Sequence, residues 1–151
     1  CRAFHACLLA DIYRILLTDC IENKRGSSVT NTNLPNNSYA KKAIEYIENH
    51  YKDDITLSVI SAYIGLTPTY FANAFKKVTN TSFMHFLNVV RLNKALSDMI
   101  RNDISAKEAA ENNGFSNVKS MISYCKKVYG CTPSEYKRRI TEEKSKKESV
   151  T

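Results

Sequence analysis

Two segments of the chain share one pattern. Residues 65–80 have the sequence GLTPTYFANAFKKVTN, and residues 114–130 have the sequence GFSNVKSMISYCKKVYG. Each segment begins with a glycine, continues with a residue suited to cap a helix, and then places apolar residues at helical spacing. Aligned on their Lys-Lys-Val triplets, the two segments lie 50 residues apart. We therefore expect the chain to contain two copies of one helical unit.

The residues around both segments predict helices rather than strands. Only 4 glycines and 3 prolines interrupt the 151 residues, and no alternation of apolar and polar residues holds for long. Thr56 is suited to cap a helix that ends at Gly65, and Ser105 is suited to begin one that ends at Gly114. A long helix over residues 82–100, about 28 Å in length, follows the first copy. We predict an all-α fold of two helix-turn-helix units joined by this long helix.

The second helix of each unit, over residues 67–79 and 117–129, has an apolar face and a polar face. In the first of these helices the predicted inward face consists of Tyr70, Phe71, Ala74, Phe75 and Val78. A helix-turn-helix unit packs one face of its second helix and leaves the other free to enter the major groove of DNA. A connector of about 28 Å can set two such helices roughly one DNA turn apart. Two units together favour DNA binding, although a single glycine turn between short helices occurs in many all-α proteins without that function.

The charge of the chain favours a polyanionic partner. The formal net charge is +7, and residues 40–140 contain 15 Lys and Arg against 9 Asp and Glu. A protein-docking module is the alternative, and it predicts an exposed apolar patch around Met121 and Ile122 instead of a continuous positive surface. The distribution of charge therefore distinguishes the two functions.

The histidines and cysteines give no sign of catalysis. His5, His50 and His85 have no evident catalytic partner, so we expect neither an enzyme nor a cofactor. The 5 cysteines form no CxxC motif, and we expect reduced thiols. Cys1, His5 and Cys7 could ligate a metal, but a small-residue face of an apolar helix is the reading we adopt, and we predict no metal site.

The domain organisation follows from changes in composition. Residues 1–23 have the pattern of an amphipathic helix, and residues 24–37 (KRGSSVTNTNLPNN) have the composition of a linker. Residues 38–140 hold the two units, with Ser38 as the expected N-cap of their first helix. Residues 141–151 are expected to be a charged, disordered tail. Since no stretch approaches the roughly 20 apolar residues of a membrane span, we expect a cytoplasmic protein with no membrane partner.

The segments TLSVISAYIGLTPTYFANAFKKVTNTSFMHFLNVVRLNKAL and SAKEAAENNGFSNVKSMISYCKKVYGCTPSEYKRR resemble the DNA-binding domain of AraC/XylS-type bacterial transcription regulators. The resemblance covers about residues 38–140 and includes the signature order GF, helix, KK, G, TP and Y-[KR]. It implies a transcription regulator, expected to be an activator, that binds two adjacent major-groove segments of double-stranded DNA. It further implies RNA polymerase as a partner and a homodimer formed through an upstream regulatory domain. Because the chain begins without Met, we expect residues 1–23 to be the last helix of that domain.

The resemblance also implies which side chains face the bases. In the first unit these are Thr69, Ala72 and Asn73, and in the second they are Val118, Lys119, Ile122 and Ser123. Asparagine can pair with adenine, lysine can donate to guanine, and apolar groups can touch a thymine methyl. Family members often have arginine in place of Asn73 and Ser123, so we expect modest direct readout and a larger contribution from phosphate contacts and DNA shape.

Phosphate contacts are expected at both ends of the two second helices. Their first turns offer exposed amides at Thr69 and Val118, next to Thr67 and Asn117. The cap of the second of these helices is either Ser116 or Asn117. Their last turns contain Lys76, Lys77, Lys126 and Lys127, which either contact phosphate or only offset the helix dipole in solvent.

The departures from the family pattern concentrate in the second unit. Smaller or polar residues, Ala106, Ala109, Asn113, Met121 and Cys125, stand where larger apolar ones are usual. Such losses of volume destabilise a core unless its neighbours move inward, so the second unit either packs more tightly or is the softer half. Arg91, on the connecting helix, matches a family arginine, and we expect a structural salt bridge there.

Overall fold

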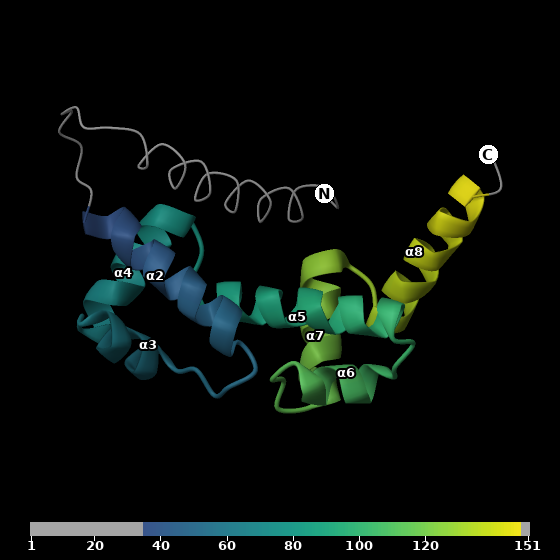
Figure 1. The fold of residues 1–151 in the computed structure, drawn as a ribbon, viewed down its shortest axis with the longest axis horizontal. Coiled ribbons are helices and arrows are strands. Elements are labelled where there is room, and N and C mark those ends of the chain that lie inside the picture. Colours follow the sequence, from purple (N-terminus) through teal and green to yellow (C-terminus); the bar gives the residue numbers. More distant parts are fainter. Residues whose placement is uncertain (1–34, 149–151) are drawn as a thin grey trace. The chain divides into compact units, whose positions relative to one another are not determined.

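The structure is a computed structural model that describes residues 35–148. These residues contain helices and no strand (Figure 1). The all-α prediction is therefore confirmed. The helix expected over residues 1–23 lies outside the described residues, as does most of the expected linker. In chain order the helices are α2 (Pro35–His50), α3 (Leu57–Ile64), α4 (Pro68–Thr79), α5 (Phe83–Arg101), α6 (Ala106–Asn112), α7 (Val118–Tyr129) and α8 (Pro133–Glu148).

The described residues form two compact units. The first unit comprises residues 35–47 and 56–83, and the second comprises residues 48–55 and 84–148. The first unit contains α3 and α4, which make one helix-turn-helix. The second unit contains α6 and α7, which make the other, together with α8 and nearly all of α5.

The core of the first unit is built on three phenylalanines. Phe71 and Phe75 of α4 and Phe83 at the start of α5 are 0 to 2% exposed, with ring centroids 5.5 to 5.8 Å apart. Edge-on and tilted contacts at this separation stabilise an aromatic cluster beyond the area that it buries. The same unit buries the aliphatic residues Ala40, Ala43, Ile44, Ile47, Ile60 and Ala74. The inward face of α4 is thus fixed by aromatic packing.

The turn between α3 and α4 has the predicted cap chemistry. The Thr56 hydroxyl oxygen accepts a hydrogen bond from the Val59 N–H at 3.3 Å, and Gly65 ends α3 with φ of +82°. The Thr67 hydroxyl oxygen accepts from the Tyr70 N–H at 3.4 Å, and Pro68 occupies the first position of α4. Proline is favoured there because its missing N–H has no helical partner to lose. These boundaries confirm the predicted ends of both helices.

Two predicted boundaries are wrong. Helix α2 begins at Pro35 instead of being capped at Ser38, because the fixed φ of proline suits the first turn of a helix. Helix α8 continues to Glu148, so residues 141–148 are helical rather than disordered. Lysine, arginine and glutamate are good helix formers, and Arg138 pairs with Glu142 at 3.7 Å one turn away. The charge run was mistaken for a sign of disorder.

The start of α8 is fixed by a capping box. The Thr132 hydroxyl oxygen accepts from the Glu135 N–H at 3.3 Å, and a Glu135 carboxylate oxygen accepts from the Thr132 N–H at 2.8 Å. These hydrogen bonds to the carboxylate hold the pKa of Glu135 below its usual range. The helix N-terminus therefore has a partner for two of its free donors.

The core of the second unit uses smaller side chains than that of the first. Met121 and Cys125 are fully buried at the positions that correspond to Phe71 and Phe75. They pack with Leu92, Ala95, Leu96, Met99, Ala109, Ala110 and Phe115. Ala106 lies at the edge of this cluster and is only partly buried. The predicted loss of volume on the inward side of α7 is therefore present in the core itself.

Asn113 is a polar side chain fully buried at the end of α6. Its amide nitrogen donates to an Asp98 carboxylate oxygen and to the Ala109 carbonyl oxygen, both at 2.8 Å. Its side-chain oxygen is buried without a hydrogen-bond partner. A buried polar atom that leaves water without a new partner costs about 1 to 3 kcal/mol. The two hydrogen bonds of the amide nitrogen stabilise the end of α6, and the unpartnered oxygen offsets part of that stabilisation.

We expect Asn113→Val to destabilise the protein by about 1 to 3 kcal/mol, because the substitution removes both hydrogen bonds of the amide nitrogen and leaves the Asp98 and Ala109 oxygens without this donor. The backbone at this position, with φ of −117° and ψ of 20°, also lies outside the β region that favours a β-branched residue. Urea denaturation would measure the change. The exposed neighbour Asn112 serves as control, since Asn112→Val should change the free energy of unfolding by less than about 0.5 kcal/mol. Equal changes in the two variants would contradict a stabilising role for the buried amide.

Candidate nucleic-acid interface

The outward face of α4 presents the residues that sequence analysis assigned to DNA. Thr69, Asn73, Lys76 and Lys77 are exposed, and Ala72 is half-buried. Thr67 is also exposed, and although its hydroxyl oxygen caps the helix, its hydroxyl proton remains available to donate. The structure thus brings the predicted residues of the first unit together on one helix.

The outward face of α7 has a similar arrangement, but more of its assigned residues are half-buried. Lys119, Ser123, Lys126 and Lys127 are exposed, whereas Val118 and Ile122 are half-buried. Val118 packs against the core of the second unit, so only part of it is available to a partner. The N-cap Asn117 accepts from the Ser120 N–H at 2.8 Å, and its amide nitrogen donates to the Ser116 hydroxyl at 3.4 Å. Asn117 therefore acts as the N-cap of α7.

The charges along both helices suit an anionic partner. Neither α4 nor α7 has an acidic residue in its first turn, so the positive end of each helix dipole is not neutralised there. Both have two lysines in the last turn, which offset the negative end. Exposed N–H groups at a helix N-terminus bind phosphate readily. Each helix can therefore interact with anionic groups at both of its ends.

Tyr70 lies towards the outward side of α4, not on the inward face predicted from the sequence. The residue was predicted to point inward, but its side chain is 49% exposed. Tyr70 lies three residues before Asn73 and seven before Lys77, so the three share one side of α4. The helical spacing could have revealed this, because a stripe containing Phe71, Ala74 and Phe75 fills the inward arc without Tyr70. A half-exposed tyrosine thus lies beside the residues of the candidate interface.

Polar contacts fix the inward side of α7 within the second unit. The Tyr124 hydroxyl lies 2.5 Å from His85 Nδ1 of α5, and the Tyr129 hydroxyl donates to the Asn93 side-chain oxygen of the same helix. The rings of Tyr129 and Tyr136 lie 4.8 Å apart. These contacts hold α7 against α5 and α8 where the core side chains are small.

Burial changes the acid-base properties of the inward side of α7. Loss of solvent raises the pKa of the Cys125 thiol to about 12, and that of Tyr124 to about 12. Tyr129 has its pKa raised to about 12 for the same reason. Since the thiolate and phenolates are disfavoured in the core, these groups are structural rather than reactive. Cys131 is a second buried free thiol in the described residues.

Residues 35–148 contain no cluster of three His, Cys, Asp or Glu side chains that could hold a metal ion. In the same part of the chain, no helix is both long and apolar enough to span a membrane. The metal ligands considered near the N-terminus, Cys1, His5 and Cys7, lie outside the described residues.

The chain is similar to known transcription regulators. A family model described as a helix-turn-helix domain matches residues 60–139. The regulatory protein PocR from Salmonella typhimurium is 29% identical over 136 residues, which cover 90% of this chain and 45% of PocR. The chain thus spans less than half the length of that relative.

Solved structures give the same result. The C-terminal domain of the two-component response regulator yesN from Fusobacterium nucleatum is 33% identical, with a TM-score of 0.59, covering 63% of this chain and 93% of that domain. A probable AraC family transcriptional regulator from Rhodopseudomonas palustris is 27% identical, with a TM-score of 0.62, covering 68% and 96% of the respective chains.

The two helix-turn-helix units and these similarities define the class of the chain, which contains a helix-turn-helix domain of the kind found in transcription regulators. Within that class, the chain belongs to the AraC/XylS-type family. The expected family is thereby confirmed.

We expect the stability of the second unit to fall as the pH rises above about 9. The folded-state pKa values of Cys125, Tyr124 and Tyr129 are raised above the ordinary values of 9.0 and 10.0, so the folded state keeps protons that the unfolded chain releases. The stabilisation that these protonated groups give to the second unit is complete below pH 9 and declines as the pH rises towards 12. Urea denaturation across this range measures it. In Cys125→Val the decline should begin nearer pH 10, and an unchanged onset would contradict the role of the thiol.

Proposed function

We propose that α4 and α7 each enter one of two adjacent major-groove segments of double-stranded DNA. The observation that carries this proposal is common to both helices. Each presents an exposed polar face with two lysines in the last turn and no acidic residue in the first. A helix with this distribution has base-contacting groups along its length and phosphate-contacting groups at its ends.

Direct base contacts are assigned to a few side chains. The exposed Asn73 amide has the donor and acceptor that pair with adenine N7 and N6, and the Lys119 ammonium can donate to guanine O6 or N7. Ala72, Val118 and Ile122 supply methyl groups for thymine, and Thr69 and Ser123 supply hydroxyls. Since no arginine lies on either face, we propose modest direct readout supported by DNA shape.

Phosphate contacts supply the larger part of the proposed affinity. Lys76, Lys77, Lys126 and Lys127 are exposed, and their ammonium groups can replace counterions on the DNA backbone. Tyr70, which is 49% exposed, lies beside Asn73 and Lys77 on α4 and adds aromatic surface to the proposed interface. We also propose that Thr67 and Asn117, as caps, hold the first-turn amides in place for phosphate.

The chain is proposed to be the DNA-binding part of a larger regulator. PocR is more than twice as long as the region matched here, which supports a further regulatory domain. We propose that such a domain senses an effector and forms a homodimer, that residues 1–23 are its last helix, and that the regulator works as an activator contacting RNA polymerase in the cytoplasm. The domain boundaries at residues 24–37 and 38–140 are part of the same proposal. A catalytic role is not proposed, because transcription regulators of this family are not typically enzymes.

The experiment that tests the function is a selection from random duplexes of about 25 base pairs at several salt concentrations, followed by sequencing of the tightest binders. Two half-elements about 10 base pairs apart, with affinity that falls steeply with salt, are expected. Enrichment of one half-element would reject a base-specific role for one of the two helices. Binding that does not depend on salt would favour the protein-docking alternative.

We expect Lys126→Gln together with Lys127→Gln to weaken binding to all sequences alike. Each lost phosphate contact should reduce the slope of log affinity against log salt by about 0.9. The exposed Lys107 on α6 provides the control, because Lys107→Gln removes a charge away from the proposed interface. An equal reduction of the slope in the control would show that only net charge matters.

Asn73→Ala should act differently from the lysine changes. It is expected to reduce discrimination at one base pair by about 1 to 3 kcal/mol and to leave the salt dependence almost unchanged. Competition between duplexes that differ at single positions measures this. The control is Asn102→Ala, since Asn102 is exposed beyond the end of α5. A uniform loss of affinity for every competitor would instead assign Asn73 to the DNA backbone.

A further inference from the structure

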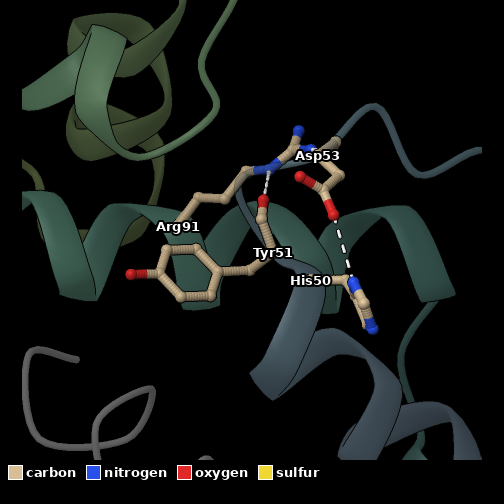
Figure 2. Close-up of polar contacts among 4 residues, drawn as sticks. All are labelled: His50, Tyr51, Asp53 and Arg91. Carbon is tan, nitrogen blue, oxygen red and sulfur yellow. Dashed lines mark hydrogen bonds and ion pairs between the residues drawn. The ribbon is translucent and has the colours of Figure 1, made fainter.

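Arg91 of α5 binds the turn after α2 through main-chain carbonyls (Figure 2). Its Nε donates to the Tyr51 carbonyl oxygen at 2.6 Å, and one terminal nitrogen donates to the Asp53 carbonyl oxygen at 2.7 Å. Arg91 is only 8% exposed. The predicted structural role is present, but the predicted salt bridge is not the contact, because the partners in the described structure are neutral carbonyls.

The same turn is braced by its own hydrogen bonds. The Asp53 carboxylate accepts from His50 Nδ1 at 3.1 Å, as Figure 2 shows, and the Asp53 N–H donates to the His50 carbonyl oxygen at 2.8 Å. The Ile55 N–H donates to the Asp53 carbonyl oxygen at 2.9 Å. The carbonyls that Arg91 binds are therefore held in place.

Gly114, in the turn that precedes α7, lies close to the same segment of main chain and shares the Tyr51 carbonyl with Arg91. A Cβ added to Gly114 would lie 2.9 Å from the Lys52 and Tyr51 carbonyl oxygens and 3.0 Å from Arg91 Nε. Contacts this short with main-chain atoms cannot be relieved by a side-chain rotation. The position therefore requires glycine for close approach, besides its φ of +81°.

In the chain, Gly114 is followed within a few residues by the start of α7. Phe115 is buried in the core of the second unit and donates its N–H to the Ala110 carbonyl oxygen at 3.1 Å. Asn117 then caps α7 two residues later. With Gly114 held against the 51–53 turn and Phe115 held in the core, the chain has little freedom before α7 begins.

The charge of Arg91 fits this fixed site. Burial lowers its pKa, while the nearby Asp54 and Asp53 act in the opposite direction. A guanidinium stays protonated even so, and its planar array of donors can span two carbonyls at once. A lysine ammonium is a single point of charge and cannot reproduce both bonds in the same geometry.

We infer that Arg91 and Gly114, together with the carbonyls of residues 51–53, form a junction that positions the N-terminal turn of α7 for DNA. The junction lies within the second unit, because residues 48–55 belong to it. Arg91 and Gly114 are positioning residues, since they act through α7 and touch no base themselves. The inference rests on the proposed role of α7 as a DNA-binding helix.

A matched pair of glycine substitutions tests the junction. Asparagine is the non-glycine residue that tolerates positive φ best, and Asn80 already takes a φ of +55° at the end of α4. Gly130, at the equivalent end of α7, has φ of +69° and nothing within 4 Å of an added Cβ. Gly130→Asn therefore keeps the conformation without a clash, whereas Gly114→Asn keeps it and adds the contact with the carbonyls.

Amide hydrogen exchange is the readout that does not depend on DNA. In Gly114→Asn, the hydrogen-bonded amides within residues 115–121, those of Phe115, Ser120 and Met121, should exchange faster by about tenfold or more, while residues 57–79 of the first unit are unchanged. Gly130→Asn should leave both segments unchanged. The inference would be overturned if exchange became faster throughout both units, or if exchange at residues 115–121 did not change.

Arg91→Lys provides a milder second variant in case Gly114→Asn unfolds the second unit. It is expected to raise exchange at residues 115–121 in the same way, and Lys107→Gln, which removes a charge elsewhere in the unit, is expected to leave it unchanged. Unchanged exchange in Arg91→Lys would overturn the role of the guanidinium.

DNA binding by the same variants separates this inference from the proposed function. On duplexes that contain both half-elements, Gly114→Asn and Arg91→Lys should each lower base discrimination about tenfold at the half-element bound by α7. Neither variant should change discrimination at the half-element bound by α4. An equal loss at both half-elements would overturn the inference. If the unaltered protein shows no sequence-specific binding, the proposed function fails, and the exchange experiment alone decides whether the junction positions α7.

Discussion

The fold depends on burying one face of two short helices. Helices of 12 residues such as α4 and α7 are marginal on their own in water, so tertiary packing must supply their stability. In α4 this packing comes from Phe71 and Phe75 against Phe83. Because burial of the inward face fixes the rotation of the helix about its own axis, it also decides which residues remain outward. The outward face that we propose for DNA is thus a consequence of the aromatic core.

The second unit reaches the same result by different interactions. Met121 and Cys125 fill less volume than two phenylalanines, and Asn113 places a polar atom without a partner in the same unit. Hydrogen bonds compensate on the inward side of α7, through the Tyr124 and Tyr129 hydroxyls to α5. Such bonds depend more on direction than apolar contacts do. The orientation of α7 is therefore specified more by polar geometry, and less by volume, than that of α4.

Much of this arrangement could be predicted from the sequence, because caps and periodicity are local. Thr56, Thr67 and Ser105 cap the helices that were assigned to them, and the polar residues assigned to the outward faces of α4 and α7 are exposed. The errors arose where several local signals compete, as at Ser38, or where one residue lies at the border of a face, as at Tyr70. The contacts of Arg91 and Gly114 could not be predicted, because they join residues about 40 to 60 positions apart through main-chain atoms that carry no signature in the sequence.

The main-chain nature of the Arg91 contact has a consequence for sequence variation. A carbonyl oxygen is present whichever residue supplies it, so the junction makes no demand on the side chains of Tyr51 and Lys52. The chemical constraint falls instead on one guanidinium and one glycine, distant in sequence from each other. The side chains at positions 51 and 52 can therefore change without loss of the junction, as long as the backbone path of the turn is kept. A surface segment of variable sequence can in this way retain a fixed position in the fold.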